Sequence, residues 1–200
     1  MSLEVFVSNA PEGLGRLAEL SREMPEKSLD IKSLDRPLAR EILPEARESR
    51  PPMSAETREK LEGKGFPSSV LDAIGSDAEA AIYDKAPLEG GQVNGKDALL
   101  RTDIDPDAKD DRGRTNVERM QKGLAPLDSK GEPLQLHHIG QENTAPLAEL
   151  TRDEHCRNGN DSILHDKKRE STIDRMEFGD ERAAHWQARA EQLINQKDAA

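Results

Sequence analysis

Histidines are unevenly distributed along this chain of 200 residues. Imidazole is the commonest metal ligand in proteins, and it takes up a proton near neutral pH. A catalytic metal ion needs about three protein ligands and an open position for water or substrate. Four of the five histidines fall in one short stretch, which has enough members for a metal site and a general base: His137, His138, His155 and His165.

His137 and His138 are adjacent in a segment that we expect to be a β-strand. Neighbouring residues of a strand point to opposite faces, so the two imidazoles cannot easily bind one ion. This arrangement suits one metal ligand and one base, and the alternation of apolar residues before the pair does not say which is which. His155 and His165 could complete the coordination sphere.

The elements that must position these histidines can be predicted from turn and capping signals. Residues 133–139 are expected to pair with residues 124–127 in a β-hairpin that ends in the two histidines, and residues 146–150 are expected to be extended. Thr151 and Glu154 form a capping box for a helix that carries His155. Residues 158–161 then interrupt the chain before His165 and a basic helix.

Further signals predict the elements before and after this region. Capping residues start helices at Ser54, at Ser76 with Glu79, and at Thr115 with Glu118. Asn94-Gly95 is typical of a tight hairpin turn. A final helix over residues 180–195 has one apolar stripe, formed by Ala183, Trp186, Ala190 and Leu193.

Composition divides the chain into three parts. Residues 1–52 contain six prolines and no sustained apolar period, which predicts a partly disordered extension or linker. Residues 53–113 are expected to form a small mixed α/β lead-in, and residues 114–200 a core that contains the histidines. Only 2% of the residues are aromatic, so the hydrophobic core must be thin.

Charge weakens a nucleic-acid interpretation without excluding it. The net charge is −11, but the excess acid is concentrated in residues 53–113, and the last third contains a basic run at Lys167-Lys168-Arg169. The local field decides whether a phosphate backbone can approach. A single cysteine excludes an intrachain disulfide and a multi-cysteine zinc site. No apolar run reaches the roughly 20 residues of a membrane span, so no membrane insertion is expected.

Several motifs in order carry a family resemblance. They are Leu136-His137-His138-Ile139-Gly140-Gln141, residues 146–151, Glu154-His155, and Ile163-Leu164-His165-Asp166. Together they resemble the LHH family of bacterial toxin nucleases, which belongs to the HNH, or His-Me finger, superfamily. The likeness covers about residues 110–190 and continues more weakly back to about residue 53. It implies an α+β chain with a ββα-metal core around one divalent ion, decorated with several helices.

The resemblance also implies residue roles. His137 would be a metal ligand and His138 the general base. His155 and His165 are the candidates for the other two ligands, although relatives have these two histidines one helical turn apart. Pro146 stands where the asparagine of the HNH pattern would be, and Asn143, Asn158 or Asn160 could substitute for it.

Other side chains are weaker candidates for the site. Substrate phosphates could contact Lys167, Lys168, Arg169 and Arg114, although Arg114 and Arg119 could instead pair with carboxylates. Acceptors behind the ligand imidazoles could be Glu149, Gln141 or Asp166. We expect His185 to be a solvated surface residue and Cys156 a semi-buried thiol.

The function implied is a metal-dependent endonuclease toxin that hydrolyses DNA in competitor bacteria. The alternatives are an RNA nuclease of the same fold and a non-catalytic zinc-binding interaction module. The ion could be zinc, nickel, magnesium or manganese.

A toxin of this kind implies a cognate immunity protein, with residues 53–113 as part of its interface, and a delivery partner for residues 1–52. No Sec-type signal peptide is recognisable. We expect the chain to be made in the bacterial cytoplasm, exported, and active in the cytoplasm of a target cell.

Overall fold

The computed structural model of the chain describes residues 51–165, 167 and 173–198. The predicted extension therefore lies outside the described residues except for Pro51 and Pro52. Lys168, Arg169 and Asp166, which were candidates for the site, also lie outside them. Among the described residues no helix is both long and apolar enough to cross a membrane.

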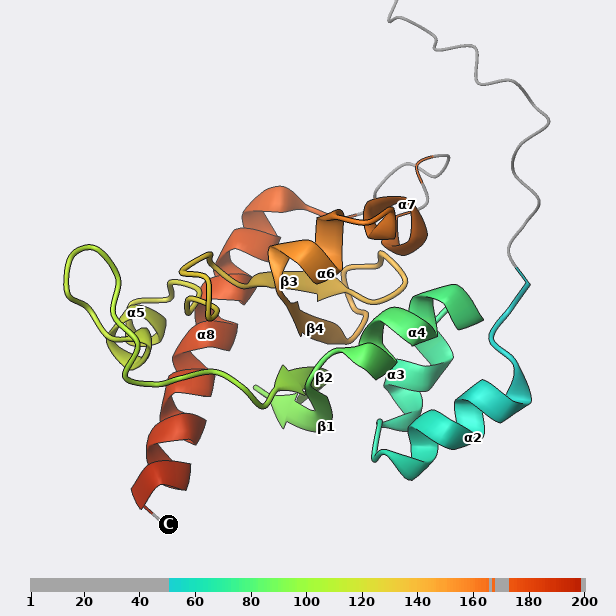
Figure 1. Cartoon of the computed structure of the whole chain (residues 1–200), viewed down its shortest axis with the longest axis horizontal. Helices are drawn as coiled ribbons and strands as arrows, with labels where there is room; N and C mark the ends of the chain where they lie inside the picture. The colour runs from blue at the N-terminus through green and yellow to red at the C-terminus, as the bar shows by residue number, and fades with distance from the viewer. Residues whose placement is uncertain (1–50, 166, 168–172, 199–200) are drawn as a thin grey trace, which may run out of the picture. The chain divides into compact units, whose positions relative to one another are not determined.

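The described chain has a mixed α+β fold around one small sheet, as the sequence predicts (Figure 1). The strand order is β1-β2-β4-β3. β1 (Leu88–Val93) pairs antiparallel with β2 (Lys96–Arg101), β2 pairs parallel with β4 (Leu147–Leu150), and β4 pairs antiparallel with β3 (Gln135–His138). Strands from residues 53–113 and from residues 114–200 thus share the sheet, and the division between those parts stays a prediction.

The hairpin turn between β1 and β2 forms where Asn94-Gly95 predicts it. Both residues have positive φ, 53° for Asn94 and 77° for Gly95. A two-residue turn of this kind matches the twist of the strands that it joins. Asn94 also donates from its side-chain amide to the Ala184 carbonyl of the last helix.

Helices cover both faces of the sheet, and the strand alternation divides the core in two. On one face α2 (Ala55–Gly63), α3 (Ser68–Ala73) and α4 (Asp77–Lys85) pack with Leu99, Ala148 and Leu150 of the sheet. On the other, α5 (Asn116–Gln121) and α8 (Arg175–Asp198) pack with Ala98, Leu100, Leu136 and Leu147. Figure 1 shows α8 on one side of the sheet and α2–α4 on the other.

The predicted helix starts at Ser54, Ser76, Thr115 and Thr151 are confirmed. Each of these side chains accepts the backbone N–H three residues on, and Thr115 and Thr151 form complete capping boxes. Glu79 was expected to close a box with Ser76. Its carboxylate instead accepts from Gly75 N and from the buried Tyr83 hydroxyl, so it joins the loop before α4 to the core.

The predicted hairpin between residues 124–127 and 133–139 is only partly formed. The two segments share one antiparallel bridge, between Leu127 and Pro133, and Leu134 N donates to the Pro126 carbonyl oxygen at 2.9 Å. The contact stays short because Pro133 lies in the bridge and proline cannot donate to a ladder. Residues 135–138 form β3 and pair with β4 instead, and β4 leads directly into α6 (Arg152–Cys156) and α7 (Asn160–Leu164).

The last helix is longer than predicted and has 24 residues. Its predicted apolar stripe is confirmed, because Trp186 and Ala190 are fully buried against the sheet and Leu193 packs beside them. His185 was expected on the surface, and this prediction is wrong: its side chain is buried. The reason is a buried carboxylate opposite it on the sheet.

That carboxylate is Glu149 of β4, which is fully buried. It accepts hydrogen bonds from Arg101 N at 2.7 Å, His185 Nε2 at 2.8 Å and Arg189 Nε at 2.8 Å. His185 and Arg189 are one turn apart on α8, so both reach the same acceptor. The hydrogen bonds and positive charge hold the pKa of Glu149 below its ordinary value although burial alone would raise it.

We expect Glu149→Gln to lower the free energy of unfolding by about 3–5 kcal/mol, because Arg189 then stays buried without its counter-charge. Urea denaturation measures this change. Glu191→Gln, an exposed position on the same helix, is the control and should change stability by less than about 0.5 kcal/mol. Equal effects of the two substitutions would contradict the assignment of Glu149 as the residue that holds α8.

Candidate metal centre and the neighbouring histidine

Three of the four predicted histidines converge. His137 comes from β3, His155 from α6, and His165 from the residue after α7. His155 Nε2 lies 3.2 Å from His137 Nδ1 and 3.2 Å from His165 Nε2, and one nitrogen from each ring lies within 4.8 Å of the others. The structure therefore brings residues 18 and 10 positions apart in sequence to one point.

Hydrogen bonds behind two of the rings fix their tautomers. His155 Nδ1 lies 2.6 Å from Gln135 Oε1, and His165 Nδ1 lies 3.0 Å from the backbone carbonyl oxygen of Asp161 and from its carboxylate. These partners are acceptors, so each Nδ1 carries the proton and each Nε2 presents a lone pair. Sequence reasoning missed both partners, although Gln135 shares a strand face with His137 and Asp161 precedes His165 by four residues.

The three side chains fit a divalent cation. Two lone pairs that face each other at 3.2 Å repel unless a proton or a cation lies between them. Two imidazoles on one tetrahedral ion, with bonds of about 2.0–2.1 Å, would have nitrogens about 3.3–3.4 Å apart. The observed separations are close to that value. Acceptors behind metal-binding imidazoles are also usual, because they orient the rings.

Burial keeps His137 and His155 neutral, which is the form that binds a metal. Loss of hydration lowers the pKa of His155 to about 4, and repulsion from His165 adds to this effect. The pKa of His137 is lowered well below its ordinary value, first by burial and then by the other histidines. His137 Nε2 is buried with no hydrogen-bond partner among the described residues.

His138 lies apart from the other three, on the opposite face of β3. Its Nε2 is 2.8 Å from Glu181 Oε2 of α8, and its ring packs against the Phe178 ring at a tilt of 55°, with the centroids 4.6 Å apart. Glu181 also binds Lys96 Nζ through Oε1 at 2.6 Å. The alternation along the strand therefore separates the two adjacent histidines, as the sequence predicts.

The surroundings of His138 leave one nitrogen able to accept a proton. If Nε2–H donates to Glu181, Nδ1 presents the lone pair, and Nδ1 is a buried atom with no hydrogen-bond partner among the described residues. Burial lowers the pKa of His138 below its ordinary value, while Glu181 acts in the opposite direction. A neutral imidazole oriented by a carboxylate is the usual arrangement of a general base. Glu181 is a third residue that sequence reasoning missed, because it is 43 positions from His138.

The other candidate residues are distributed around the site. Arg114 and Arg119 both pair with Asp110, whose pKa they lower, and Lys167 pairs with Asp161 beside His165. Glu149 was a candidate acceptor behind a ligand imidazole and instead holds α8. Cys156 was expected to be semi-buried and is an exposed free thiol, which corrects that prediction.

Of the three candidate asparagines, Asn160 connects the two helices that carry the ligands. Its side-chain amide donates to the Glu154 carbonyl oxygen at 2.8 Å. Asn143 lies in the β3–β4 loop and binds Lys96 and the backbone of Asp174. Asn158 has a positive φ of 56° in the turn between α6 and α7.

Comparison with known families identifies the segment that contains these residues. Residues 115–192 match the LHH family, described as a nuclease of the HNH/ENDO VII superfamily with conserved LHH. The chain has that run at Leu136-His137-His138, and the resemblance proposed from the sequence is confirmed for this segment. The match indicates a nuclease. No solved structure matches the chain significantly.

We expect the protein to bind one divalent ion, such as Zn²⁺ or Co²⁺, with all three histidines. His155→Ala should abolish tight binding, and Gln135→Ala should weaken it about 10- to 100-fold because the His155 ring loses its orienting acceptor. Calorimetric titration measures both affinities. Gln121→Ala, an exposed glutamine on α5, is the control. Unchanged affinity in His155→Ala would contradict the site.

The metal-free protein should lose stability as the pH falls from about 7 to about 5. His137 and His155 have lower pKa values folded than unfolded, so the unfolded chain binds more protons below the ordinary value of 6.5. Stability therefore rises with pH across this window. Chemical denaturation with a chelator present measures the slope. His155→Gln should flatten the profile, and an unchanged slope in that variant would show that other groups cause it.

Proposed function

We propose that this protein is a metal-dependent endonuclease that hydrolyses phosphodiester bonds, with DNA as its substrate. The observation that carries the proposal is the convergence of three imidazole nitrogens within 4.8 Å, one residue away from a histidine that a carboxylate orients. The family match over the same residues supports a nuclease. The choice of DNA over RNA as the substrate follows from the family resemblance, and the cleavage assay below tests it.

The ligands of the proposed ion are His137, His155 and His165, with Gln135 and Asp161 behind two of them. A divalent ion at this position would supply Lewis acidity to a phosphodiester oxygen and to the departing oxygen. The three residues come from separate elements, so the protein must be folded before they can bind one ion together.

His138 is the proposed general base. His138 Nε2–H donates a hydrogen bond to Glu181, and His138 Nδ1 takes a proton from the attacking water. The lowered pKa of His138 keeps the ring neutral and ready to accept that proton at neutral pH. Lys96 keeps the Glu181 carboxylate in place through its other oxygen.

Strand geometry restricts how the substrate can approach. His137 and His138 leave opposite faces of β3, and the strand ends at His138. β3 is the edge strand of the sheet, so a phosphodiester bond that reaches both groups must cross either its free edge or its carboxyl end. At that end the chain turns through Gly140 and Gln141, which both have positive φ.

The biological role that we propose is that of a toxin used against competitor bacteria, delivered through residues 1–52 and neutralised by an immunity protein. The support is the family resemblance and the charge of residues 53–113. Exposed carboxylates of that segment include Glu89, Asp103, Asp105 and Asp107. If these charges steer an inhibitor, its association rate should fall steeply as salt is raised. A rate independent of salt would exclude this interface.

Plasmid cleavage is the direct test of the nuclease. Protein stripped of metal with a chelator should be inactive. It should again nick or linearise the plasmid when magnesium, manganese, zinc or nickel is added back. His138→Ala should lower the turnover rate by about 10²- to 10⁴-fold and leave metal affinity unchanged, because His138 is not a ligand. Total RNA is assayed in parallel, and RNA loss with intact plasmid would make the protein an RNA nuclease. If both polymers survive with metal bound, catalysis is excluded and a zinc-binding interaction module remains.

Glu181→Gln tests the orienting role of the carboxylate. The amide can still accept from His138 but no longer stabilises a protonated ring, so we expect a smaller loss of turnover than in His138→Ala. Glu191→Gln, exposed on the same helix, should cleave at the native rate. Full activity in Glu181→Gln would contradict the proposed role of Glu181 in stabilising the protonated His138 ring.

A further inference from the structure

A cavity of about 690 Å³ lies beside the histidines, between α5, β3, α6 and α8. Its walls include three arginines, Arg119, Arg152 and Arg182, and an apolar floor that includes Leu124 and Leu134. Glu132 is the carboxylate on its rim and faces Arg157 at 3.6 Å. The volume is large enough for one or two units of a polymer chain rather than for a single ion.

Two of the arginines in this cavity are exposed and have no carboxylate partner. Neither Arg152 nor Arg182 forms an ion pair with any described residue, although Arg182 lies over the Phe178 ring at 5.7 Å. Most of the described arginines do pair with a carboxylate, namely Arg58, Arg101, Arg114, Arg119, Arg157 and Arg189.

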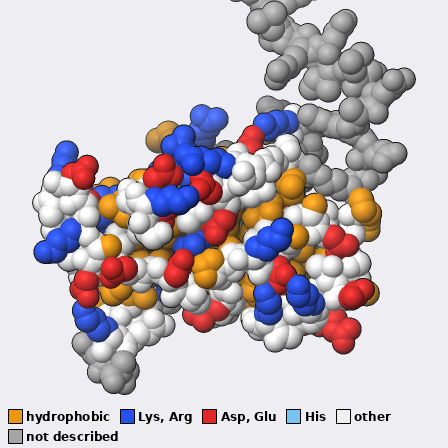
Figure 2. Space-filling view, in the orientation of Figure 1, with side chains coloured by type: hydrophobic (Ala, Val, Ile, Leu, Met, Phe, Trp, Pro, Cys, Tyr) orange, Lys and Arg blue, Asp and Glu red, His pale blue; other side chains and the backbone are white. Residues whose placement is uncertain are grey.

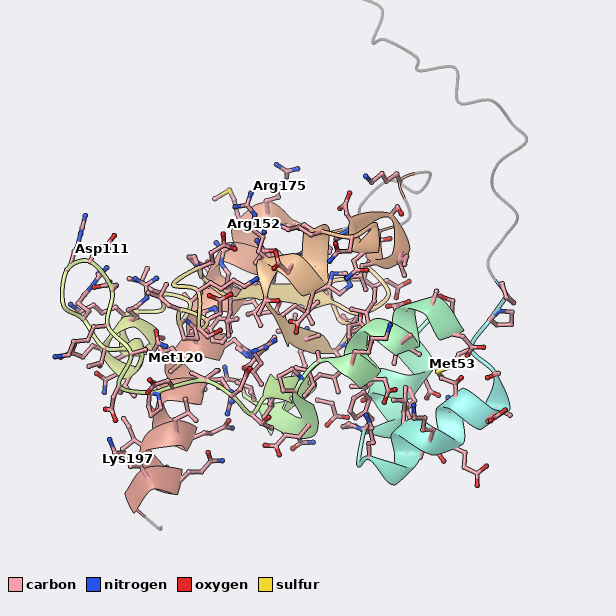
Figure 3. All side chains as sticks on the ribbon, viewed as in Figure 1. Met53, Asp111, Met120, Arg152, Arg175 and Lys197 are labelled. Carbon is pink, nitrogen blue, oxygen red and sulfur yellow. The ribbon has the colours of Figure 1, made fainter. Side chains whose placement is uncertain are left out.

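Arg175 is a third exposed arginine near the cavity that forms no ion pair with any residue that the structure describes. Arg175 lies seven residues before Arg182, so both are on the same side of α8 two turns apart. In Figure 3 the labelled Arg152 and Arg175 project from neighbouring parts of one edge of the molecule. Figure 2 shows several Lys and Arg side chains over α6 and the first turns of α8, with Asp and Glu side chains among them.

The cavity adjoins both halves of the proposed active site. On one side Gln135 and Cys156 are in its wall, and Gln135 hydrogen-bonds His155. On the other side Arg182 lies over Phe178, whose ring packs against that of His138. A chain of phosphates bound in the cavity would therefore pass close to the metal ligands and to the base.

We propose that this cavity binds the phosphodiester backbone of the nucleic acid next to the bond that is cut. Arg152 and Arg182 contact phosphate oxygens, and the apolar floor packs against the sugars. Arg119 shapes the wall, because its guanidinium is held by Asp110 and the Ala125 carbonyl oxygen. The proposal rests on the proposed nuclease function and names where its substrate is held.

Binding without cleavage tests the proposal. The affinity of the full chain for a labelled DNA duplex and for a labelled RNA of equal length is measured by fluorescence anisotropy, with a chelator present and at several salt concentrations. Each arginine that contacts a phosphate contributes about fivefold to affinity at physiological salt, so Arg152→Gln/Arg182→Gln should bind roughly 20-fold more weakly. The slope of log affinity against log salt should fall by about 2.

Arg112→Gln is the matched control, because Arg112 is exposed and lies in the loop before α5, away from the cavity (Figure 3, beside Asp111). Zinc affinity and the melting temperature of the double variant should match the native protein, which separates the cavity from the metal centre. If the double variant loses affinity for only one of the two polymers, that polymer is the class of nucleic acid that the cavity binds. If the double variant binds nucleic acid like Arg112→Gln while the native chain cleaves it, the proposed role of the cavity is wrong and the proposed nuclease function is retained. If the native chain neither binds nor cleaves either polymer, both proposals fail.

Discussion

The buried carboxylate of Glu149 is the contact on which the rest of the fold depends. It sits in the central part of the sheet, ties the backbone of β2 to β4, and holds α8 through His185 and Arg189. A buried charge is costly unless it is fully paired, so α8 has one favourable position on the sheet. That position brings Glu181 to His138 and Arg182 to the cavity. The reactive groups on α8 are thus positioned by a contact one to two turns farther along the same helix.

A second constraint is the alternation of side chains along β3. Gln135 and His137 face the helices that carry the other two ligands, while Leu136 and His138 face α8. One strand of four residues therefore serves two environments. One face is lined by hydrogen-bonded imidazoles, and the other by a carboxylate and an aromatic ring. The proposed division of labour between ligand and base follows from this geometry, since no movement of the backbone is needed to separate them.

Much of the local structure could be predicted from the sequence because its signals are short-range. The caps at Ser54, Thr115 and Thr151, the Asn94-Gly95 turn and the stripe around Trp186 each depend on residues within a few positions of one another. The pairing of β3 could not be predicted this way. The choice between residues 124–127 and residues 147–150 depends on which segment can form a complete ladder of backbone hydrogen bonds with β3. His185 was misjudged for the same reason: Arg182 and Arg189 on its side of α8 are polar, and the group that buries it is 36 positions away on β4.

The histidine cluster could be recognised from residue type alone, but its supporting residues could not. Gln135 and Asp161 are common polar residues, and only the folded positions of His155 and His165 show what they do. Glu181 is similarly one acidic residue among 40 in the chain. The sequence therefore identifies groups that are rare, such as imidazoles, and misses abundant groups whose role depends on long-range contacts.

Because His155 lies on α6 and His165 follows α7, a shared metal ion would also affect how firmly these two helices are held together. On a single helix two ligands one turn apart would be held at a fixed separation by the helix itself. Here an exposed turn at Asn158 and Gly159, both with positive φ, separates them, and α7 is held by side-chain contacts that include the packing of Ile163 and Leu164 and the Asn160 amide. An ion shared by His137, His155 and His165 would act as a crosslink that closes two loops, much as a disulfide does in small secreted proteins. In a chain with a thin core and one cysteine, such an ion would be a structural staple as well as a reagent.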